Sequence, residues 1–341
     1  MTITNADTRT LIGAVSVIHR PASFYLDRYF SQLMEFETET LDFDVISGGR
    51  TIAPYVHPDV PAKHVRTGGY KTHSFRPPYI KLLESVKPGQ ALRRRAGEAY
   101  NGEMSPGDRL DALTLDTLVE QRRAILRRKE AMAVEAIDTG AIVCEGEAYP
   151  RTVVDFDRDP SLSQALTGAG RWGEAGVRPL KTIKDQATAI QRLTGVLSTD
   201  VIFDPLAGEL FQQDDEIKEL LDIRRQASGQ LELGPVVPIS DAQPIGSIGV
   251  FNFFIYQDYY TKVDGTDGQL LPDFTMHICS AALEGVQAQG AIQDADLGLV
   301  SAEIAPKAWN EKNPSARQAM SQSAPLPVPT RINQSGRTRV R

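Results

Sequence analysis

Cysteine is scarce in this sequence: only Cys144 and Cys279 occur among 341 residues, and they lie far apart along the chain. Two such residues indicate no disulfide framework, and their scarcity favours a reducing compartment. No apolar run approaches the roughly 18 residues that a membrane-spanning helix needs. The first ten residues, MTITNADTRT, lack the apolar stretch behind a basic start that defines a secretory signal. We therefore expect neither a secreted protein nor a membrane protein.

Signatures of catalysis and of metal binding are also missing. The sequence has no G-x-x-x-x-G-K-[ST] loop for nucleotide hydrolysis and no G-x-S-x-G turn for a hydrolase nucleophile. His57, His64 and His73 do not have the spacing of zinc ligands, and neither cysteine is near them in sequence. The sequence thus predicts no catalytic, cofactor or metal site, and we expect that the protein is not an enzyme.

One glycine-rich segment, Gly168–Gly173, formally matches the pattern G-x-G-x-x-G. A dinucleotide-binding turn needs a strand before this pattern and a helix that opens within it. The preceding residues are polar and turn-like, and Gly176 and Pro179 follow, which would break the required helix. A flexible loop is the preferred interpretation, and an enzyme that binds a nucleotide cofactor through this loop is the distant alternative.

Charge is distributed very unevenly along the chain. The net charge is −7, but residues 42–95 carry +6, residues 185–303 carry −14, and residues 304–341 carry +6. Such segregation indicates a partner, and another copy of the same chain would satisfy it.

Residues 42–95 combine short β-prone pieces, at 42–46 and 70–75, with many prolines and glycines. Proline at this density excludes a continuous helix and a central strand, and it fits an edge hairpin. Because large apolar side chains are few, this segment has no core of its own. We predict an extended hairpin that must lie on another surface.

The most helical stretch is Asp116 to Asp138, in which Leu118, Ile125 and Met132 recur every seven residues. Gly140 is the expected stop. Arg122 and Lys129 fall inside the apolar stripe. Either their stems pack while the charges reach the rim, or they meet carboxylates of a neighbouring subunit.

The remaining elements follow an α+β order without sustained βαβ alternation. We expect strands at 141–143, 152–156, 201–203, 245–256 and 276–280, and helices at 183–193 and 206–225.

An ordered series of short motifs then carries a family resemblance. These motifs are Phe75-Arg-Pro-Pro-Tyr79-Ile-Lys81, Val86-Lys-Pro88, Leu92-Arg-Arg94, Gly146-Glu-Ala-Tyr149, Val153-Val-Asp155, Val201-Ile-Phe-Asp-Pro205, Leu271-Pro272-Asp273, Ile292-Gln-Asp-Ala-Asp296 and Gln322-Ser-Ala-Pro-Leu326. These motifs keep their order and approximate spacing over roughly residues 25 to 330. On this basis the chain resembles the major capsid protein E family of tailed phages.

The resemblance implies the Hong Kong 97-type phage capsid fold, an α+β architecture. It divides the chain into an N-terminal arm (1–41), an extended loop (42–100), a peripheral domain with a long spine helix at about 116–138 (101–184 and 301–341) and an axial domain (185–300).

The resemblance also implies a function, which is self-assembly into hexamers and pentamers of an icosahedral shell around packaged double-stranded DNA. Scaffolding, portal and decoration proteins would be partners, with assembly in the host cytoplasm and a final place in the virion capsid. An encapsulin-like or prophage-derived shell protein of the same fold is the alternative.

Candidate site residues are basic. Those expected at interfaces between subunits are Arg50, Lys63, Arg66, Lys71, Arg76, Lys81, Arg93, Arg94, Arg95, Arg122 and Lys129. Those expected to face DNA are Arg331, Arg337, Arg339 and Arg341.

Overall fold

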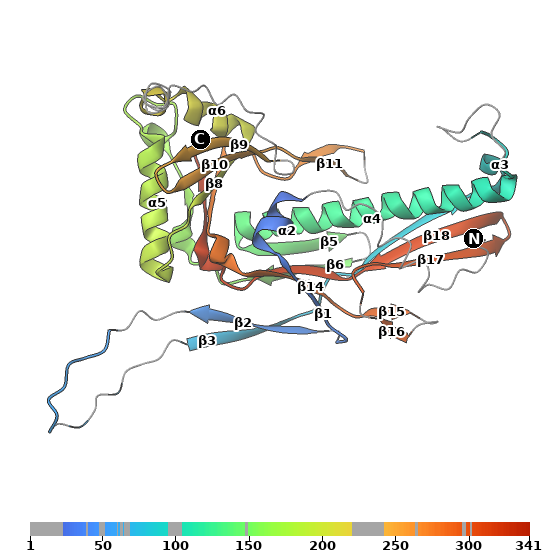
Figure 1. Cartoon of the computed structure of the whole chain (residues 1–341), viewed down its shortest axis with the longest axis horizontal. Coiled ribbons are helices and arrows are strands. Elements are labelled where there is room, and N and C mark those ends of the chain that lie inside the picture. The colour runs from blue at the N-terminus through green and yellow to red at the C-terminus, as the bar shows by residue number, and fades with distance from the viewer. Residues whose placement is uncertain are drawn as a thin grey trace.

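The computed structural model describes residues 23–38, 40–47, 52–59, 61, 64, 69–94, 104–146, 149–219, 242–262, 265–294, 298–300 and 302–341. These residues form two adjoining bodies and a projecting hairpin (Figure 1). One body is built on a six-stranded sheet, and the other on the long helix α4 (Pro106–Thr139) with smaller sheets beside it. The predicted α+β class is confirmed.

The six-stranded sheet has the order β7-β20-β13-β8-β10-β9. Its strands are β7 (Ser163–Ala165), β8 (Asp200–Phe203), β9 (Ala242–Ile248), β10 (Phe251–Tyr256), β13 (Thr275–Cys279) and β20 (Ser335–Arg339). The pairs β8–β10 and β7–β20 are parallel, and the other neighbours are antiparallel. The strand expected over 245–256 is in fact the two strands of the β9–β10 hairpin.

Both faces of this sheet are covered, which explains why β8 is apolar at successive positions. Side chains alternate between the faces of a strand. Val201 and Phe203 share one apolar cluster with helices α5 (Pro179–Thr194) and α6 (Pro205–Gln213). Ile202 belongs to the opposite cluster, together with helix α2 (Phe24–Tyr29) and the end of α4. The predicted strand 201–203 and helix 183–193 are therefore confirmed.

The N-terminal segment is partly a packed element. Helix α2 is followed by strand β1 (Gln32–Glu35), and Phe24 to Leu26 are almost completely buried. Within the expected arm 1–41, residues 1–22 lie outside the described part of the chain.

Helix α4 has 34 residues and is about 51 Å long at 1.5 Å per residue. It begins ten residues before the predicted start, because Ser105 caps it and forms a reciprocal capping box with Asp108. It ends at Gly140 as predicted, with the left-handed φ of 79° that glycine adopts at low cost.

Smaller sheets surround α4. The sheet β17-β18-β4 packs against its N-terminal half, the sheet β1-β14-β19 against its C-terminal half, and the β5–β6 hairpin lies beside them. Their strands are β4 (Ile80–Val86), β5 (Ala141–Gly146), β6 (Tyr149–Asp155), β14 (Gly285–Gln289), β17 (Ala305–Lys312), β18 (Ser315–Ser323) and β19 (Pro325–Pro329). The remaining short elements are α3 (Pro88–Ala91), β11 (Tyr259–Thr261), β12 (Asp267–Gln269), β15 (Ile292–Asp294) and β16 (Gly298–Val300).

A hairpin is present in the first part of the segment predicted to form one, whereas β4 and α3 in the later part pack on the body beside α4. Strands β2 (Leu41–Ser47) and β3 (Gly69–Phe75) pair antiparallel over their full length and point away from both bodies (Figure 1).

The basic C-terminal segment 304–341 forms strands of three different sheets. β17, β18 and β19 lie beside α4, whereas β20 lies between β7 and β13 in the six-stranded sheet. The sequence of β20 has no apolar period because its buried positions are Ser335, Gly336 and Thr338.

The limits expected for the peripheral and axial domains stay a prediction.

Substitution of Gly140 by alanine should destabilise the subunit. The residue has a φ of 79°, and an added Cβ would lie 2.8 Å from the Cβ of Arg158. We expect a loss of roughly 1–3 kcal/mol in the free energy of unfolding, measured by urea denaturation. Gly107→Ala, in the open first turn of the same helix, is the matched control and should not destabilise. Equal effects of the two substitutions would contradict this account of the helix end.

Candidate assembly surfaces

The root of the hairpin rests on the body through aromatic rings. Phe43 and Phe75 stack with centroids 5.2 Å apart, and His73 stacks on Phe75 at 5.8 Å. Phe43 also contacts the fully buried Phe156, at 5.9 Å. Because these rings share one face of the hairpin, that face is attached to the body and the direction in which the hairpin leaves is set.

Asp157 adds a polar contact to this root. Its carboxylate accepts a hydrogen bond of 2.7 Å from Lys71 Nζ and lies 3.4 Å from His73 Nε2. The hydrogen bond from Lys71 holds the pKa of Asp157 below its ordinary value. The Lys71 side chain is 72% exposed, so this pair orients the hairpin and contributes little to stability.

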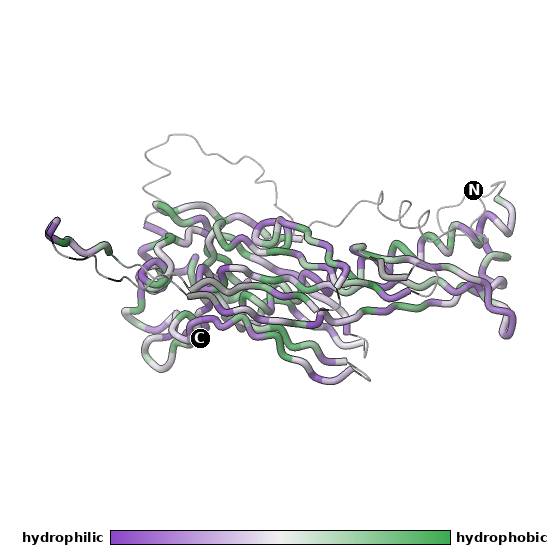
Figure 2. Tube along the Cα trace, turned by 90° about the horizontal axis from the view of Figure 1, so that it is seen from below, coloured by the Kyte–Doolittle hydropathy of each residue, from purple (hydrophilic) through white to green (hydrophobic). Residues whose placement is uncertain are grey.

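The far part of the hairpin exposes apolar side chains. All residues from 52 to 59 are exposed, Ile52 to 88% and Tyr55 completely. Figure 2 shows this segment clear of the body. Large apolar groups held away from any core indicate an interaction surface.

The basic candidates for interfaces separate into three groups. Four lie outside the described residues: Arg50, Lys63, Arg66 and Arg95. Five are exposed: Lys71, Arg76, Lys81, Arg93 and Arg94. Two are buried in the stripe of α4: Arg122 and Lys129.

Arg122 and Lys129, which lie within the apolar stripe of α4, both belong to the core of this subunit. Lys129 is 1% exposed, and its Nζ donates a hydrogen bond of 2.5 Å to Glu303 of the same chain. Arg122 is 8% exposed. The expectation that Lys129 meets a neighbouring subunit's carboxylate is therefore wrong, because Glu303, distant in sequence, supplies that carboxylate.

The exposed arginines near α3 line a cavity of about 530 Å³ beside the first turns of α4. Its charged lining residues are Arg93, Arg94, Arg109, Glu84, Asp116 and Glu120. Three cations and three carboxylates balance one another, so this cavity does not favour an anion over a cation.

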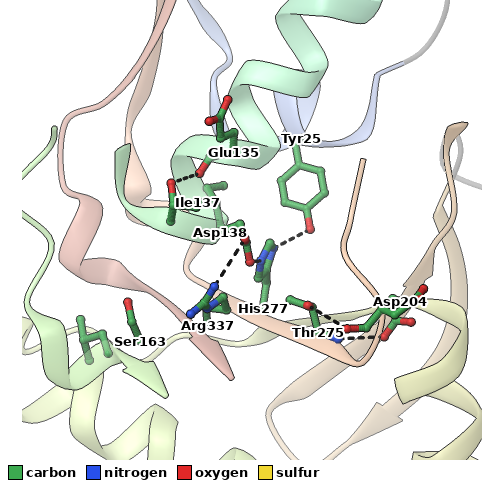
Figure 3. A network of polar contacts seen from close by, with 12 residues as sticks. Tyr25, Glu135, Ile137, Asp138, Ser163, Asp204, Thr275, His277 and Arg337 are labelled. Atoms are coloured by element: carbon green, nitrogen blue, oxygen red, sulfur yellow. Dashed lines mark hydrogen bonds and ion pairs between the residues drawn. The ribbon is translucent and has the colours of Figure 1, made fainter. Parts of the chain in front are cut away.

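The four C-terminal arginines have different environments. Arg331 forms an ion pair of 3.3 Å with Glu284. Arg337 is partly buried and points toward Asp138, at 3.6 Å (Figure 3). Arg339 and Arg341 are exposed, and Arg341 lies over the ring of Phe274. Arg331, Arg339 and Arg341 are all exposed, whereas Arg337 is partly buried.

A buried polar network joins the two bodies at the end of α4 (Figure 3). Tyr25 on α2 lies 2.9 Å from His277 Nδ1, and His277 Nε2 lies 3.1 Å from Asp138. Asp138 is in the last turn of α4, whereas His277 is in β13 and Arg337 in β20. Arg158 donates to the backbone carbonyls of Ile137 and Asp138, which lack partners within the helix.

The protonation states in this network follow from burial. Burial lowers the pKa of His277, although Asp138 opposes this, so the ring is neutral at pH 7. Burial alone would raise the pKa of Asp138, but the hydrogen bond with His277 and the charges of Arg337 and Arg158 hold it below its ordinary value. Because a carboxylate only accepts, the ring proton lies on Nε2, and the Tyr25 hydroxyl donates to Nδ1.

Glu130, two turns earlier on α4, fastens the N-terminal segment. Its carboxylate accepts hydrogen bonds from the backbone N–H groups of Tyr25 and Leu26, at 2.8 and 3.0 Å, and from the Tyr256 hydroxyl at 3.2 Å. Burial raises its pKa to about 7, although these hydrogen bonds oppose the shift.

The order tyrosine, histidine, aspartate resembles a nucleophile, base and orienting acid. Tyr25 and His277 are both 0% exposed, however, so a substrate has no access to them in this state. The network instead connects elements that are distant in sequence. In the sequence, the sign of this network was a lone histidine, His277, in the apolar strand TMHIC. The strand pattern does not reveal which residues His277 contacts.

The Gly168–Gly173 segment does not have the geometry of a cofactor-binding turn. It contains one short 3₁₀ helix, Gly168–Gly170, and exposed turns separate it from the start of α5 at Pro179. Within the described ranges, no group of three or more His, Cys, Asp and Glu side chains could hold a metal ion. No described helix is both long and apolar enough to cross a membrane.

Replacement of Glu130 by glutamine should change how stability depends on pH. A carboxyl group with a folded-state pKa of about 7 and an unfolded value of 4.5 binds more protons when folded between these pH values. Its contribution to stability is therefore present below about pH 4.5 and is lost as the pH rises to about 7. The upper limit of the change is about 3 kcal/mol.

The measurement is urea unfolding of the unassembled subunit at pH 5 and pH 8. We expect the wild type to lose more stability than Glu130→Gln between these two values. The lowered pKa of His277 makes stability depend on pH with the opposite sign. This contribution is the same in both proteins and cancels when they are compared. The same pH dependence in both proteins would contradict the assigned environment of Glu130.

Known proteins are similar in sequence to nearly the whole chain. The family model described as phage major capsid protein E matches residues 7–340. The major capsid protein of Enterobacteria phage P21 is 29% identical over 331 residues, which cover 94% of this chain and 95% of that protein. The major capsid protein of Escherichia phage lambda is 29% identical over 311 residues, 89% of each chain.

A solved structure gives the same result for the fold. The crystal structure of a capsid protein from an Escherichia coli CFT073 prophage has a TM-score of 0.76 at 20% identity and covers 98% of this chain and 99% of that one. The predicted phage capsid fold and the resemblance based on sequence motifs are confirmed. The chain belongs to the phage major capsid protein E family.

Proposed function

We propose that copies of this chain assemble into hexamers and pentamers of a closed icosahedral shell that encloses packaged double-stranded DNA. The observation that carries the proposal is the hairpin, which is attached at its root and exposes apolar side chains at its far end. Fully extended, residues 41–57 would reach at most about 60 Å. A second copy is the surface that such an arm requires.

The contact between copies is heterologous, because the hairpin of one subunit meets a different surface on the next. Heterologous contacts close into rings when the rotation between copies allows it. We assign the body with the six-stranded sheet, α5 and α6 to the axial domain, and the body with α4, β4, β17 and β18 to the peripheral domain. The two-body arrangement in Figure 1 and the family membership support this assignment.

Charge on the basic segment 42–95, which contains the hairpin as well as β4 and α3, steers assembly, and apolar contacts hold it. The segment 42–95 is basic and the block 185–303 is acidic. Exposed ion pairs contribute about 0–1 kcal/mol each, so their main effect is on encounter and register. Arg76, just after β3, and Lys81, on β4, are exposed and suit this role.

Other partners follow from the same function. Scaffolding, portal and decoration proteins would act with the shell protein, assembly would take place in the host cytoplasm, and the finished shell is part of the virion. Arg331, Arg339 and Arg341 are the described C-terminal arginines best placed to contact DNA, because all three are exposed. The proposed role is structural and includes no catalytic step.

Removal of the apolar groups at the hairpin tip should prevent assembly without unfolding the subunit. For the double substitution Ile52→Ser and Tyr55→Ser, we expect few or no shells in electron micrographs and sedimentation profiles. The free energy of unfolding should change by less than about 0.5 kcal/mol because both side chains are exposed.

Tyr55→Phe keeps the ring and is the matched control, which should form shells at the yield of the wild type. Normal assembly of the double serine variant would contradict the proposed role of the tip.

A further inference from the structure

Helix α5 carries cations along its exposed side. Its buried side packs on the six-stranded sheet, on the face away from α4 (Figure 1). Lys181, Lys184 and Arg192 are exposed on the other side, and Asp185 is the only carboxylate of this helix. Three positive charges therefore share one surface with a single negative charge.

The glycine-rich segment Gly168–Gly176 extends this surface at the start of the helix. It presents exposed Arg171, and exposed Arg178 lies just before α5; Glu174 is the one carboxylate of the segment. Three of its exposed glycines have open space where a Cβ would lie: Gly168, Gly170 and Gly176. The chain from 168 to 192 thus has five basic and two acidic residues, a net charge of +3 in a protein of −7.

These five cations, here called the α5 cation face, are Arg171, Arg178, Lys181, Lys184 and Arg192. None of them forms an ion pair with a residue in the described ranges. Buried cations elsewhere have such partners: Lys129 pairs with Glu303, and Lys307 with Asp294 at 2.7 Å. Like charges gathered on one surface repel one another, and a bound anion removes this repulsion. The α5 cation face therefore suits an anionic partner.

We propose that the α5 cation face binds the phosphate backbone of packaged double-stranded DNA without regard to base sequence. This inference rests on the proposed function and adds to it a surface that meets the DNA. Lysine and arginine neutralise phosphates, and each such contact releases a counterion. The exposed glycines beside the cations leave the protein backbone open to close approach by a phosphate. Binding is therefore controlled by salt and not by sequence.

The shape of the α5 cation face selects an extended polymer over a small anion. From Lys181 to Arg192 the helix is about 17 Å long at 1.5 Å per residue. Duplex DNA carries about ten negative charges over the same length of its axis. The exposed side of a helix is convex, whereas sites for small molecules are concave. The dimensions and the shape thus fit a DNA backbone that crosses the helix.

The polar character of this face favours DNA over a second copy of the chain. No large apolar side chain is exposed from Gly168 to Arg192, and the next one along the chain is Leu193. Interfaces between proteins have an apolar and aromatic centre that is depleted in lysine, whereas protein–DNA interfaces are more polar and strongly positive. A surface made of lysine, arginine and glycine belongs to the second kind.

The C-terminal arginines are on a different surface. Thr338 in β20 forms a hydrogen bond with Gln186, which is on the buried side of α5. Because side chains alternate between the faces of a strand, Arg339 points to the opposite face of the sheet. Substitutions on the α5 cation face leave those arginines in place, so the two surfaces can be tested separately.

The test is a titration of a short fluorescent DNA duplex of arbitrary sequence with the unassembled full chain, followed by anisotropy at several salt concentrations. The variant combines Lys181→Gln, Lys184→Gln and Arg192→Gln. We expect its affinity to fall roughly tenfold or more in low salt, because three phosphate contacts are lost. The slope of the logarithm of affinity against the logarithm of salt concentration should become shallower by about 2.7.

The matched control removes three exposed cations elsewhere and combines Arg127→Gln, Lys262→Gln and Lys312→Gln. Its change in net charge is the same, but we expect the affinity and the salt slope of the wild type. Both variants should unfold at the wild-type temperature because every substituted side chain is exposed. Equal affinity of the two variants, or no binding of the duplex by the wild type at any salt concentration, would overturn the proposal.

Electron microscopy of the same proteins separates this inference from the proposed function. We expect the α5 variant to form shells at the wild-type yield. A variant that binds DNA normally but forms no shells would assign the face to contact with a second copy and overturn the proposal. Absence of shells for the wild-type protein under every assembly condition would count against the proposed function itself, whatever the titration shows.

Discussion

The hydrogen bond between Asp138 and His277 is the contact on which the arrangement of the two bodies depends. Asp138 is in the last turn of the long helix, and His277 lies in the middle of β13, so this interaction directly relates the body built on α4 to the body built on the six-stranded sheet. Tyr25 extends it to the N-terminal helix and Arg337 to the C-terminal strand. All of these groups are largely removed from water, where an unpaired charge or donor would be costly. The network is therefore stable only when every element is in place.

This junction also determines where the assembly surfaces lie. Helix α4 ends at Gly140 and continues directly into β5 and β6, and Phe156 and Asp157 after β6 hold the root of the hairpin. The direction of the hairpin thus depends on the few residues that follow β6. Attachment of the hairpin to the frame of α4 would allow each subunit to present a fixed geometry to the next, which a closed shell requires.

Much of this architecture was predictable from local patterns. The seven-residue spacing of Leu118, Ile125 and Met132 identified the long helix, and the proline-rich segment identified a hairpin without a core. The motif series identified the family. Local patterns failed where partners are distant in sequence: Lys129 finds Glu303, and Asp138 finds His277, at separations that no periodicity reveals. Strand β20 was missed because its buried residues are small and polar, and β19 because three prolines obscured a strand at the edge of a sheet.

The central claim is that this subunit forms closed shells with copies of itself. Electron microscopy of the purified chain, expressed alone and with the proposed scaffolding protein, tests it most directly. We predict uniform closed particles with hexameric and pentameric units, formed in at least one of these two conditions. A protein that remains a stable monomer in both, across salt concentration and pH, would contradict the claim.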